Sequence, residues 1–256
     1  MANVIHSLQG HVATITLANE GRYNAMSLAM WHKLADTLSE LHAHSEVRAL
    51  VLRGEGDKAF VSGADISEFG EQRSDPRGVS AYDKAVAVAQ VALAGFRCPV
   101  IAAVSGICYG GGLGLVLACD LRYGSPSAKF RMPAARLGLG YSFAGIKRMV
   151  AILGAARTSE MFYTARVYDA LQAERMGLLA AVHEHVFDYA VETAAEIAAN
   201  APLTIRAAKL AVDALLAGEE KSAAVDAAVE ACFKSSEYAE GRAAFGEKRN
   251  ARFTGH

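Results

Sequence analysis

A run of residues without a charged side chain, from Cys98 to Cys119, constrains the fold more than any other feature of this sequence. A helix of this length is able to cross a membrane. Pro99 and five glycines interrupt the run, however, so that it divides into an extended half, Val100 to Val104, and a helical half, Leu113 to Cys119. The five glycines are Gly106, Gly110, Gly111, Gly112 and Gly114. We therefore expect a buried strand, a glycine turn and a buried helix, and no membrane span.

Composition argues against several classes of function. The chain has 256 residues, 26 Lys and Arg against 27 Asp and Glu, and a formal net charge of -1. This length predicts one large domain or two small ones. Because positive charge is not in excess, we expect no binding to nucleic acid or to an acidic membrane. The four cysteines have neither CxxC spacing nor a nearby His pair, which indicates no metal site and no disulfide framework. No secretory signal is recognisable, so we expect a cytoplasmic protein.

Hydrophobic patterns predict strands and helices that alternate along most of the chain. Val4 to Ser7 and His11 to Leu17 predict an opening hairpin, and Ser27 is the predicted N-cap of the first helix. The further predicted elements are the strands Ala49 to Leu52, Val100 to Val104, Leu121 to Tyr123 and Lys129 to Met132, an exposed loop at Gly70 to Gly78, and a helix at Ala81 to Phe96.

After Gly154 the pattern becomes almost wholly helical. The predicted helices are Phe187 to Asn200, Leu203 to Leu216, Ala223 to Lys234 and Tyr238 to Lys248. We therefore predict the α/β fold class, with an α/β core over residues 1–195 and a helical C-terminal region over residues 196–256.

The glycine cluster is the first candidate for chemistry, because it lies where a strand leads into a helix. The first turn of a helix has unpaired N–H groups and the positive end of the helix dipole. Gly110 to Gly112 would therefore accommodate a phosphate or a developing oxyanion close to the backbone. The sequence contains neither a P-loop nor a GxGxxG pattern there, which argues against nucleotide binding. Glycine chosen for close helix packing is the alternative explanation.

Several motifs accompany the cluster in a fixed order. They are Asn24 to Ser27, Ala59 to Ile66, Ile101 to Gly106, Tyr109 to Gly112, Cys119 and Asp120, Ala128 to Phe130, Glu174 to Leu178 and Glu240 to Arg249. Together they resemble the crotonase (enoyl-CoA hydratase/isomerase) superfamily. The resemblance implies a spiral of ββα units with a helical C-terminal trimerisation region, assembled as a homotrimer or a dimer of trimers. It also implies an acyl-CoA substrate, no metal, and no cofactor beyond the CoA that belongs to the substrate.

By the same resemblance, the backbone N–H groups of Ala64 and Gly111 hold the thioester oxygen as it becomes an enolate. The residues expected around the CoA are Arg22, Asn24, Ala25, Lys58, Ser62, Gly63, Asp65, Ile66, Tyr109, Gly110 and Lys248. Arg22, Lys58 and Lys248 are the candidates for the phosphates, with Lys248 contributed by the terminal helix or by a neighbouring subunit. For each of these cations a solvated surface charge is the alternative.

The sequence departs from the family at the two positions where its hydratases carry catalytic glutamates. Gly114 and Ala134 stand there, and neither side chain can move a proton. Efficient two-carboxylate hydration and double-bond isomerisation are therefore disfavoured. The segment Gly112 to Leu115 also resembles chlorobenzoyl-CoA dehalogenases, but their nucleophilic Asp falls at Ser142.

Decarboxylation of a malonyl-type thioester needs an oxyanion hole but no base, because loss of CO₂ itself creates the enolate. Pro133 to Ile146 resembles methylmalonyl-CoA decarboxylases, whose active-site Tyr aligns with Tyr141, although these enzymes have His where Ala64 stands and keep the helix Glu. A lyase, hydratase-like or decarboxylase-like, is therefore the leading hypothesis, and a catalytically inactive acyl-CoA-binding protein is the alternative. A nucleophile elbow at Gly140 to Ala144, with Asp169 and His183 or His185, is disfavoured because no strand pattern precedes it.

Overall fold

A six-stranded sheet forms the centre of the molecule. The computed structural model describes residues 2–65 and 76–255. The sheet has the order β1-β2-β3-β5-β7-β10, from strands β1 (Asn3–Gln9), β2 (Val12–Ala18), β3 (Ala49–Gly54), β5 (Val100–Val104), β7 (Leu121–Gly124) and β10 (Ala181–Val182). β1 and β2 pair in antiparallel fashion, as the hairpin prediction requires, and the other neighbours in the sheet are parallel.

A second, four-stranded sheet has the order β4-β6-β8-β9, from β4 (Ala59–Val61), β6 (Ile107–Tyr109), β8 (Lys129–Arg131) and β9 (Tyr168–Asp169). Consecutive strands alternate between the two sheets before the chain enters a helix. β5 and β6 lead into α4 (Gly111–Ala118), and β7 and β8 lead into α5 (Ala134–Leu137). This repeated strand, strand, helix order is the spiral of ββα units that the family resemblance implies.

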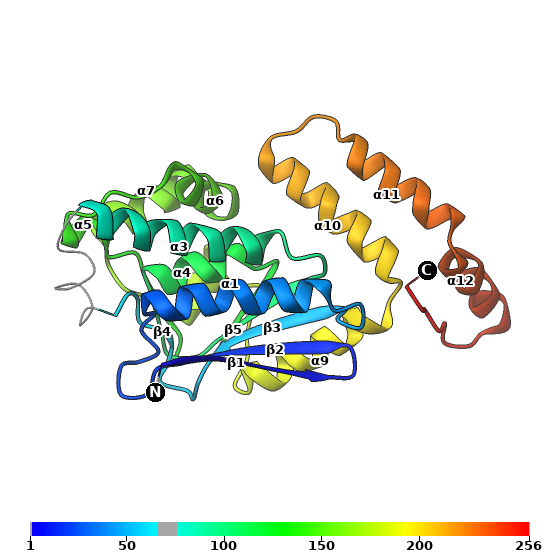
Figure 1. Cartoon of the computed structure of the whole chain (residues 1–256), viewed down its shortest axis with the longest axis horizontal. Coiled ribbons are helices and arrows are strands. Elements are labelled where there is room, and N and C mark those ends of the chain that lie inside the picture. The colour runs from blue at the N-terminus through cyan, green and yellow to red at the C-terminus, as the bar shows by residue number, and fades with distance from the viewer. Residues whose placement is uncertain (1, 66–75, 256) are drawn as a thin grey trace.

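Helices cover both faces of the larger sheet (Figure 1). On one face lie α1 (Leu28–Ala43), α3 (Pro76–Ala94) and α4, and on the other lies α9 (Val186–Ala199). Alternate strand residues divide between two cores, so that Leu50 and Leu52 face the first group and Ala49 and Val51 face α9. Burial on both faces explains why these strands are continuously apolar.

The charge-free run folds as the sequence predicts. β5 is buried along its whole length, and α4 is buried from Gly112 to Ala118, so both halves of the run belong to the core. Within the described ranges, none of the helices has the length and apolarity that crossing a bilayer requires. Ser27 is the N-cap of α1, and its side chain accepts a hydrogen bond of 3.1 Å from the Met30 N–H.

The helix α3 begins earlier than the sequence predicts. Residues 76–78 belong to this helix, whereas the exposed loop was expected to continue to Gly78, and the rest of that loop lies outside the described residues. Pro76 suits a first helical position, where its missing N–H has no helical acceptor. Tyr82, Ala85, Ala89 and Leu93 follow at helical spacing and are buried, which stabilises the longer helix.

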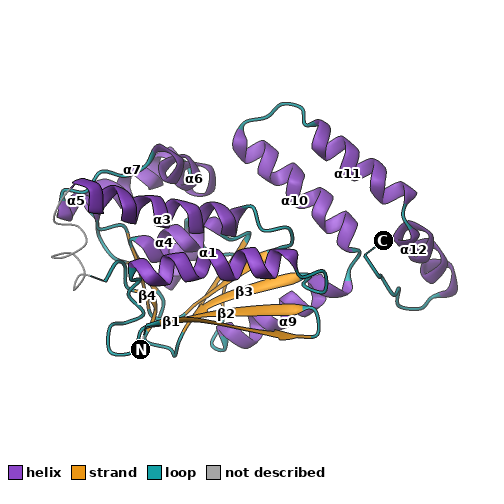
Figure 2. Ribbon diagram, viewed as in Figure 1, coloured by secondary structure: helices purple, strands orange, loops and turns teal. Residues whose placement is uncertain are grey.

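Four shorter helices, α5, α6 (Phe143–Leu153), α7 (Ala155–Thr164) and α8 (Ala170–Arg175), precede the C-terminal part. There α10 (Pro202–Ala217), α11 (Ala223–Lys234) and α12 (Ser236–Glu247) lie to one side of the sheets (Figure 2). The buried Lys209 of α10 forms an ion pair of 2.5 Å with Asp120, which fastens this region to the core. The boundary expected at 195/196 falls inside α9, whose Ala198 is buried against the sheet, and the two-part division stays a prediction.

Candidate active site

Two bends of the backbone approach each other closely beside the first turn of α4. One follows β4 and contains Gly63 and Ala64, and the other joins β6 to α4. A Cβ built on Gly112 would lie 2.5 Å from the carbonyl oxygen of Val61, and a Cβ built on Gly63 would lie 3.8 Å from that of Tyr109. Gly112 thus has no space for a side chain, which explains one glycine of the cluster by close approach of β4.

The N–H group of Ala64 is free in the first bend. Met26 pairs with Ala64 through two hydrogen bonds that use the flanking residues: the Met26 N–H donates to Gly63 at 2.8 Å, and the Asp65 N–H donates to Met26 at 3.0 Å. Because successive N–H groups point to opposite sides of an extended chain, that of Ala64 points away from Met26. In the part of the chain that the structure describes, it has no acceptor.

The N–H group of Gly111 is free in the second bend. Gly111 is the first residue of α4, where no helical carbonyl can accept from it. Its neighbour Gly110 is the N-cap at φ 52°, and the Gly110 N–H donates to the Arg131 carbonyl at 3.0 Å. Across residues 2–65 and 76–255, no backbone acceptor meets the Gly111 N–H. Two adjacent bends therefore each present one unpaired donor.

Buried aromatic side chains support both bends. The indole of Trp31 lies beneath Gly111, since a Cβ built there would be 3.1 Å from Trp31 Cζ2. Trp31 Nε1 donates to the hydroxyl of Tyr82 at 2.8 Å, and this hydroxyl donates to the Met26 carbonyl at 3.0 Å. Met26 in turn pairs with Ala64. One hydrogen-bonded chain thus connects the supports of the two free N–H groups.

The position of the first family glutamate is occupied by side chains from elsewhere. A Cβ built on Gly114 would lie 2.3 Å from Gln90 Nε2 and 3.5 Å from the Tyr141 hydroxyl oxygen. Ala134, at the second position, is buried at the start of α5. Gln90 is missing from the sequence-based site, although it is the one polar residue between Ala85 and Phe96, and this isolation was the available signal.

Tyr141 is held by packing. Its ring meets Phe162 edge-on at a centroid distance of 5.2 Å, and a Cβ built on Gly145 would lie 2.4 Å from its Cε1. Burial raises the pKa of Tyr141 to about 12, and no charged residue that the structure describes contributes to this shift. The phenol therefore remains protonated at neutral pH and can donate a hydrogen bond, but it cannot serve as a base.

Several residues expected at the CoA have structural partners. Asn24 is buried, accepts from the Asn19 N–H and donates to the carbonyls of Glu55 and Ala59, at 3.1, 3.0 and 2.8 Å. Asp65 is also buried, and its carboxylate accepts from Arg22 at 3.0 Å and from Asn19 at 3.3 Å. These contacts fasten the loop before α1 to the bend at Ala64.

The remaining expected residues separate into those near the bends and those elsewhere. Ala25 lies on the loop before α1, Ser62, Gly63 and Gly110 lie on the two bends, and Tyr109 is the last residue of β6. The Ser62 hydroxyl donates to the Arg22 carbonyl at 3.2 Å.

Lys58 is exposed next to β4, and its ammonium has no partner among the residues that the structure describes. Lys248 is the C-cap of α12, which lies on the opposite side of the molecule from β4 (Figure 1). The structure therefore does not bring Lys248 to this site within one chain. Ile66 lies outside the described residues.

The nucleophile elbow is excluded by local structure. Ser142 is the N-cap of α6, where its hydroxyl accepts from the Gly145 N–H at 3.2 Å, and α5 rather than a strand precedes it. Asp169 caps α8 in a capping box.

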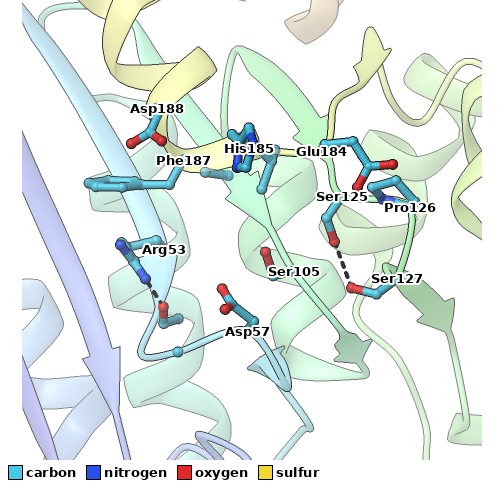
Figure 3. A pocket seen from close by; sticks show the side chains of 14 residues that line it. Arg53, Asp57, Ser105, Ser125, Pro126, Ser127, Glu184, His185, Phe187 and Asp188 are labelled. Carbon is cyan, nitrogen blue, oxygen red and sulfur yellow. Dashed lines mark hydrogen bonds between the residues drawn. The ribbon is translucent and has the colours of Figure 1, made fainter.

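Figure 3 shows a surface cleft of about 490 Å³. Its lining includes Arg53, Asp57, Ser105 and His185, but neither Ala64 nor Gly111 nor Tyr141. Arg53 is engaged there by the Phe187 ring, 4.1 Å from the ring centroid, and by the Gly54 carbonyl at 3.1 Å. The cleft therefore does not coincide with the candidate active site.

Comparisons with known proteins show the family to which the chain belongs. The model of the family described as enoyl-CoA hydratase/isomerase matches residues 7–256. The short-chain-enoyl-CoA hydratase of Clostridium acetobutylicum is 32% identical, over 96% of this chain and 95% of that protein. The crotonyl-CoA hydratase of Syntrophomonas wolfei is 30% identical, over 98% of this chain and 97% of that protein.

A solved structure described as an enoyl-CoA hydratase/carnithine racemase, from Magnetospirillum magneticum, superposes with a TM-score of 0.95. It is 33% identical and covers 100% of this chain and 97% of its own. The spiral of ββα units and the helical C-terminal region define a crotonase fold. The chain belongs to the enoyl-CoA hydratase/isomerase family, within the crotonase superfamily.

Proposed function

We propose that this protein is an acyl-CoA lyase that stabilises a thioester enolate with the N–H groups of Ala64 and Gly111. The observation that carries the proposal is the pair of unpaired backbone donors on two adjacent bends. An acyl-CoA substrate is favoured because relatives over nearly the whole chain are named as CoA-thioester hydratases. One oxyanion donor of this kind is worth about 2.7–4 kcal/mol of the barrier.

The two candidate reactions differ in their need for proton transfer. Hydration is favoured by the relatives' names, but Gly114 and Ala134 supply no carboxylate, and Tyr141 is a protonated phenol at neutral pH. Decarboxylation of a malonyl-type thioester forms the enolate without a base, and this reaction suits the groups present better.

Turnover of a panel of esters tests the proposal. Crotonyl-CoA, malonyl-CoA and methylmalonyl-CoA would be incubated with the protein, and the products identified by mass spectrometry. Gly111→Pro removes the N–H, and we expect kcat to fall about 10²–10³-fold. Gly111→Ala is the matched variant, because it retains the N–H, and it should keep a larger share of the turnover. Equal kcat values for wild type and Gly111→Pro would remove Gly111 from the oxyanion hole.

The second candidate is a catalytically inactive acyl-CoA-binding protein, which the two missing carboxylates favour. Such a protein would bind the same esters tightly in equilibrium titrations and yield no product from any of them.

The assembly is a further part of the proposal. Large apolar side chains are exposed on the C-terminal helices, among them Leu215, Phe233 and Phe245, which are 72%, 63% and 88% exposed. Burial of these side chains between copies would favour self-association. The family resemblance makes a homotrimer or a dimer of trimers the expected assembly, in which Lys248 of a neighbouring subunit would reach the CoA phosphates. Native mass spectrometry measures the number of subunits directly. A cytoplasmic location stays a prediction of the sequence.

A further inference from the structure

Gln90 and Tyr141 place two neutral polar groups at one point of the proposed acyl site. The carboxamide Nε2 and the phenol oxygen lie 2.3 and 3.5 Å from the position that a Gly114 Cβ would take. They reach this point from different parts of the chain, Gln90 from α3 and Tyr141 from the segment before α6. Gly114 has no side chain, which leaves the space beside it open to both groups.

The position of the Gly114 Cβ lies one helical turn along α4 from Gly111, the first residue of this helix. Residues three apart on a helix share a face, and three residues advance about 4.5 Å along the axis. A thioester carbonyl held by the Gly111 N–H would therefore have the substituents of its α-carbon within about one helical turn of Gln90 and Tyr141.

Among the residues that the structure describes, those in contact with the Tyr141 ring are uncharged. The Tyr141 ring packs against Phe162 and Gly145, and burial raises its pKa without a contribution from a charged residue in the described ranges. Gln90 follows the buried Ala89 on α3 and is itself half-buried. Hydrogen bonds made in such a setting are stronger than they would be in water.

We propose that Gln90 selects the acyl group: its carboxamide N–H, together with the Tyr141 hydroxyl, binds a carboxylate on the acyl α-carbon, so that the substrates are malonyl-type CoA thioesters. This assignment rests on the proposed function and specifies its substrate class.

Neutral donors suit the charge movement of decarboxylation. The bond between the α-carbon and the carboxylate breaks, its electron pair forms the enolate double bond, and the carbonyl π pair moves to the thioester oxygen. CO₂ leaves as a neutral molecule, and a proton from water completes the α-carbon. A cation at the carboxylate would stabilise the starting charge, whereas neutral donors orient the carboxylate and leave the stronger stabilisation to the N–H groups at the enolate oxygen.

The experiment compares esters that differ only by the carboxylate: malonyl-CoA with acetyl-CoA, and methylmalonyl-CoA with propionyl-CoA. Each would displace etheno-CoA, a fluorescent CoA analogue, in a stopped-flow instrument, so that binding is read before turnover. Gln90→Glu keeps the shape and adds a negative charge, Gln90→Met removes the donors without adding charge, and Val91→Ala changes the neighbouring position, which is 70% exposed.

We expect wild type and Val91→Ala to bind the carboxylated ester of each pair more tightly. In Gln90→Glu this preference should fall about tenfold or more, and in Gln90→Met by less, while affinity for the neutral esters stays unchanged. Thermal unfolding verifies that each variant folds. The proposed substrate class is wrong if Gln90→Glu weakens the binding of both esters of a pair equally, or if wild type does not prefer the carboxylated ester. In either case the acyl-CoA function stands. If wild type binds none of the esters, the proposed function is wrong and this inference with it.

Discussion

The indole N–H of Trp31 and the hydroxyl of Tyr82 are joined by a hydrogen bond of 2.8 Å at the junction of α1 and α3. Trp31 packs beneath Gly111, and Tyr82 continues to Met26, which pairs with Ala64. Trp31, Tyr82 and Met26 are all buried, so the hydrogen bonds between them are shielded from water. The spacing of the proposed oxyanion donors therefore depends on residues that do not themselves reach the substrate.

Tyr82→Phe tests this dependence. The substitution leaves the buried Trp31 N–H without its acceptor, which costs about 1–3 kcal/mol of stability. Because the bends lose a shared support, we expect kcat to fall several-fold while KM changes little. Denaturant unfolding and steady-state kinetics measure the two effects. Tyr163→Phe, at a side chain that is 79% exposed, is the matched control. A destabilised Tyr82→Phe variant with the wild-type kcat would limit Tyr82 to a role in folding.

Gly145→Ala tests the placement of Tyr141. The added methyl group would lie 2.4 Å from the Tyr141 ring, which must move, and overpacking of this kind costs about 1–3 kcal/mol. We expect turnover to fall to the level of Tyr141→Phe, since both changes withdraw the hydroxyl from its place. The control is Gly246→Ala in α12, where a methyl group meets open space and should stabilise the helix. Undiminished turnover in Gly145→Ala would show that the position of the phenol is unimportant.

Restoring the family glutamates requires a third substitution. A side chain at position 114 collides with the Gln90 carboxamide, so Gly114→Glu and Ala134→Glu alone should add little hydration of crotonyl-CoA. With Gln90→Ala added, the carboxylate has space, and we expect hydration to rise toward the 10²–10⁴-fold that acid–base groups contribute. Loss of the enoyl absorbance measures the reaction. A folded triple variant with no gain would mean that the pocket differs from that of hydratases in shape as well as in charge.

The C-terminal tail, residues 249–255, should detach from α12 as the pH is lowered. Hydrogen bonds from the Arg249 side chain and the Arg252 N–H lower the pKa of Glu240 from 4.5 to about 2. A carboxyl group whose pKa is lower in the folded state stabilises that state at higher pH. Its contribution is therefore complete above pH 4.5 and is lost as the pH falls toward about 2.

Hydrogen exchange of the tail peptide would be measured between pH 5 and 3 and corrected for the intrinsic exchange rate. In wild type, protection of the tail amides should decrease as the pH is lowered. Glu240→Gln cannot ionise, so its tail protection should be low and independent of pH over this range. A pH-dependent loss of equal size in Glu240→Gln would assign the effect to another group.

The sequence by itself determined most strands of the larger sheet and the long helices. The charge-free run could only become a buried strand and a buried helix, because its glycines and Pro99 interrupt any continuous span. Ser27 caps α1, and Gly110 and Gly111 begin α4, since caps and turns depend on residues adjacent in the chain. The family motifs likewise predicted Ala64 and Gly111 as the oxyanion donors, which stays a prediction.

Only the tertiary structure decided which side chains meet. Gln90 and Tyr141 lie far apart in the sequence yet share the space above Gly114, while Asn24 and Asp65 are occupied by partners that no local pattern indicates. Periodicity states which face of a helix is apolar, but it does not state which residue of another helix lies opposite that face. That choice follows from how the helices and the two sheets pack, and it determines that Gln90 and Tyr141 occupy the space beside Gly114.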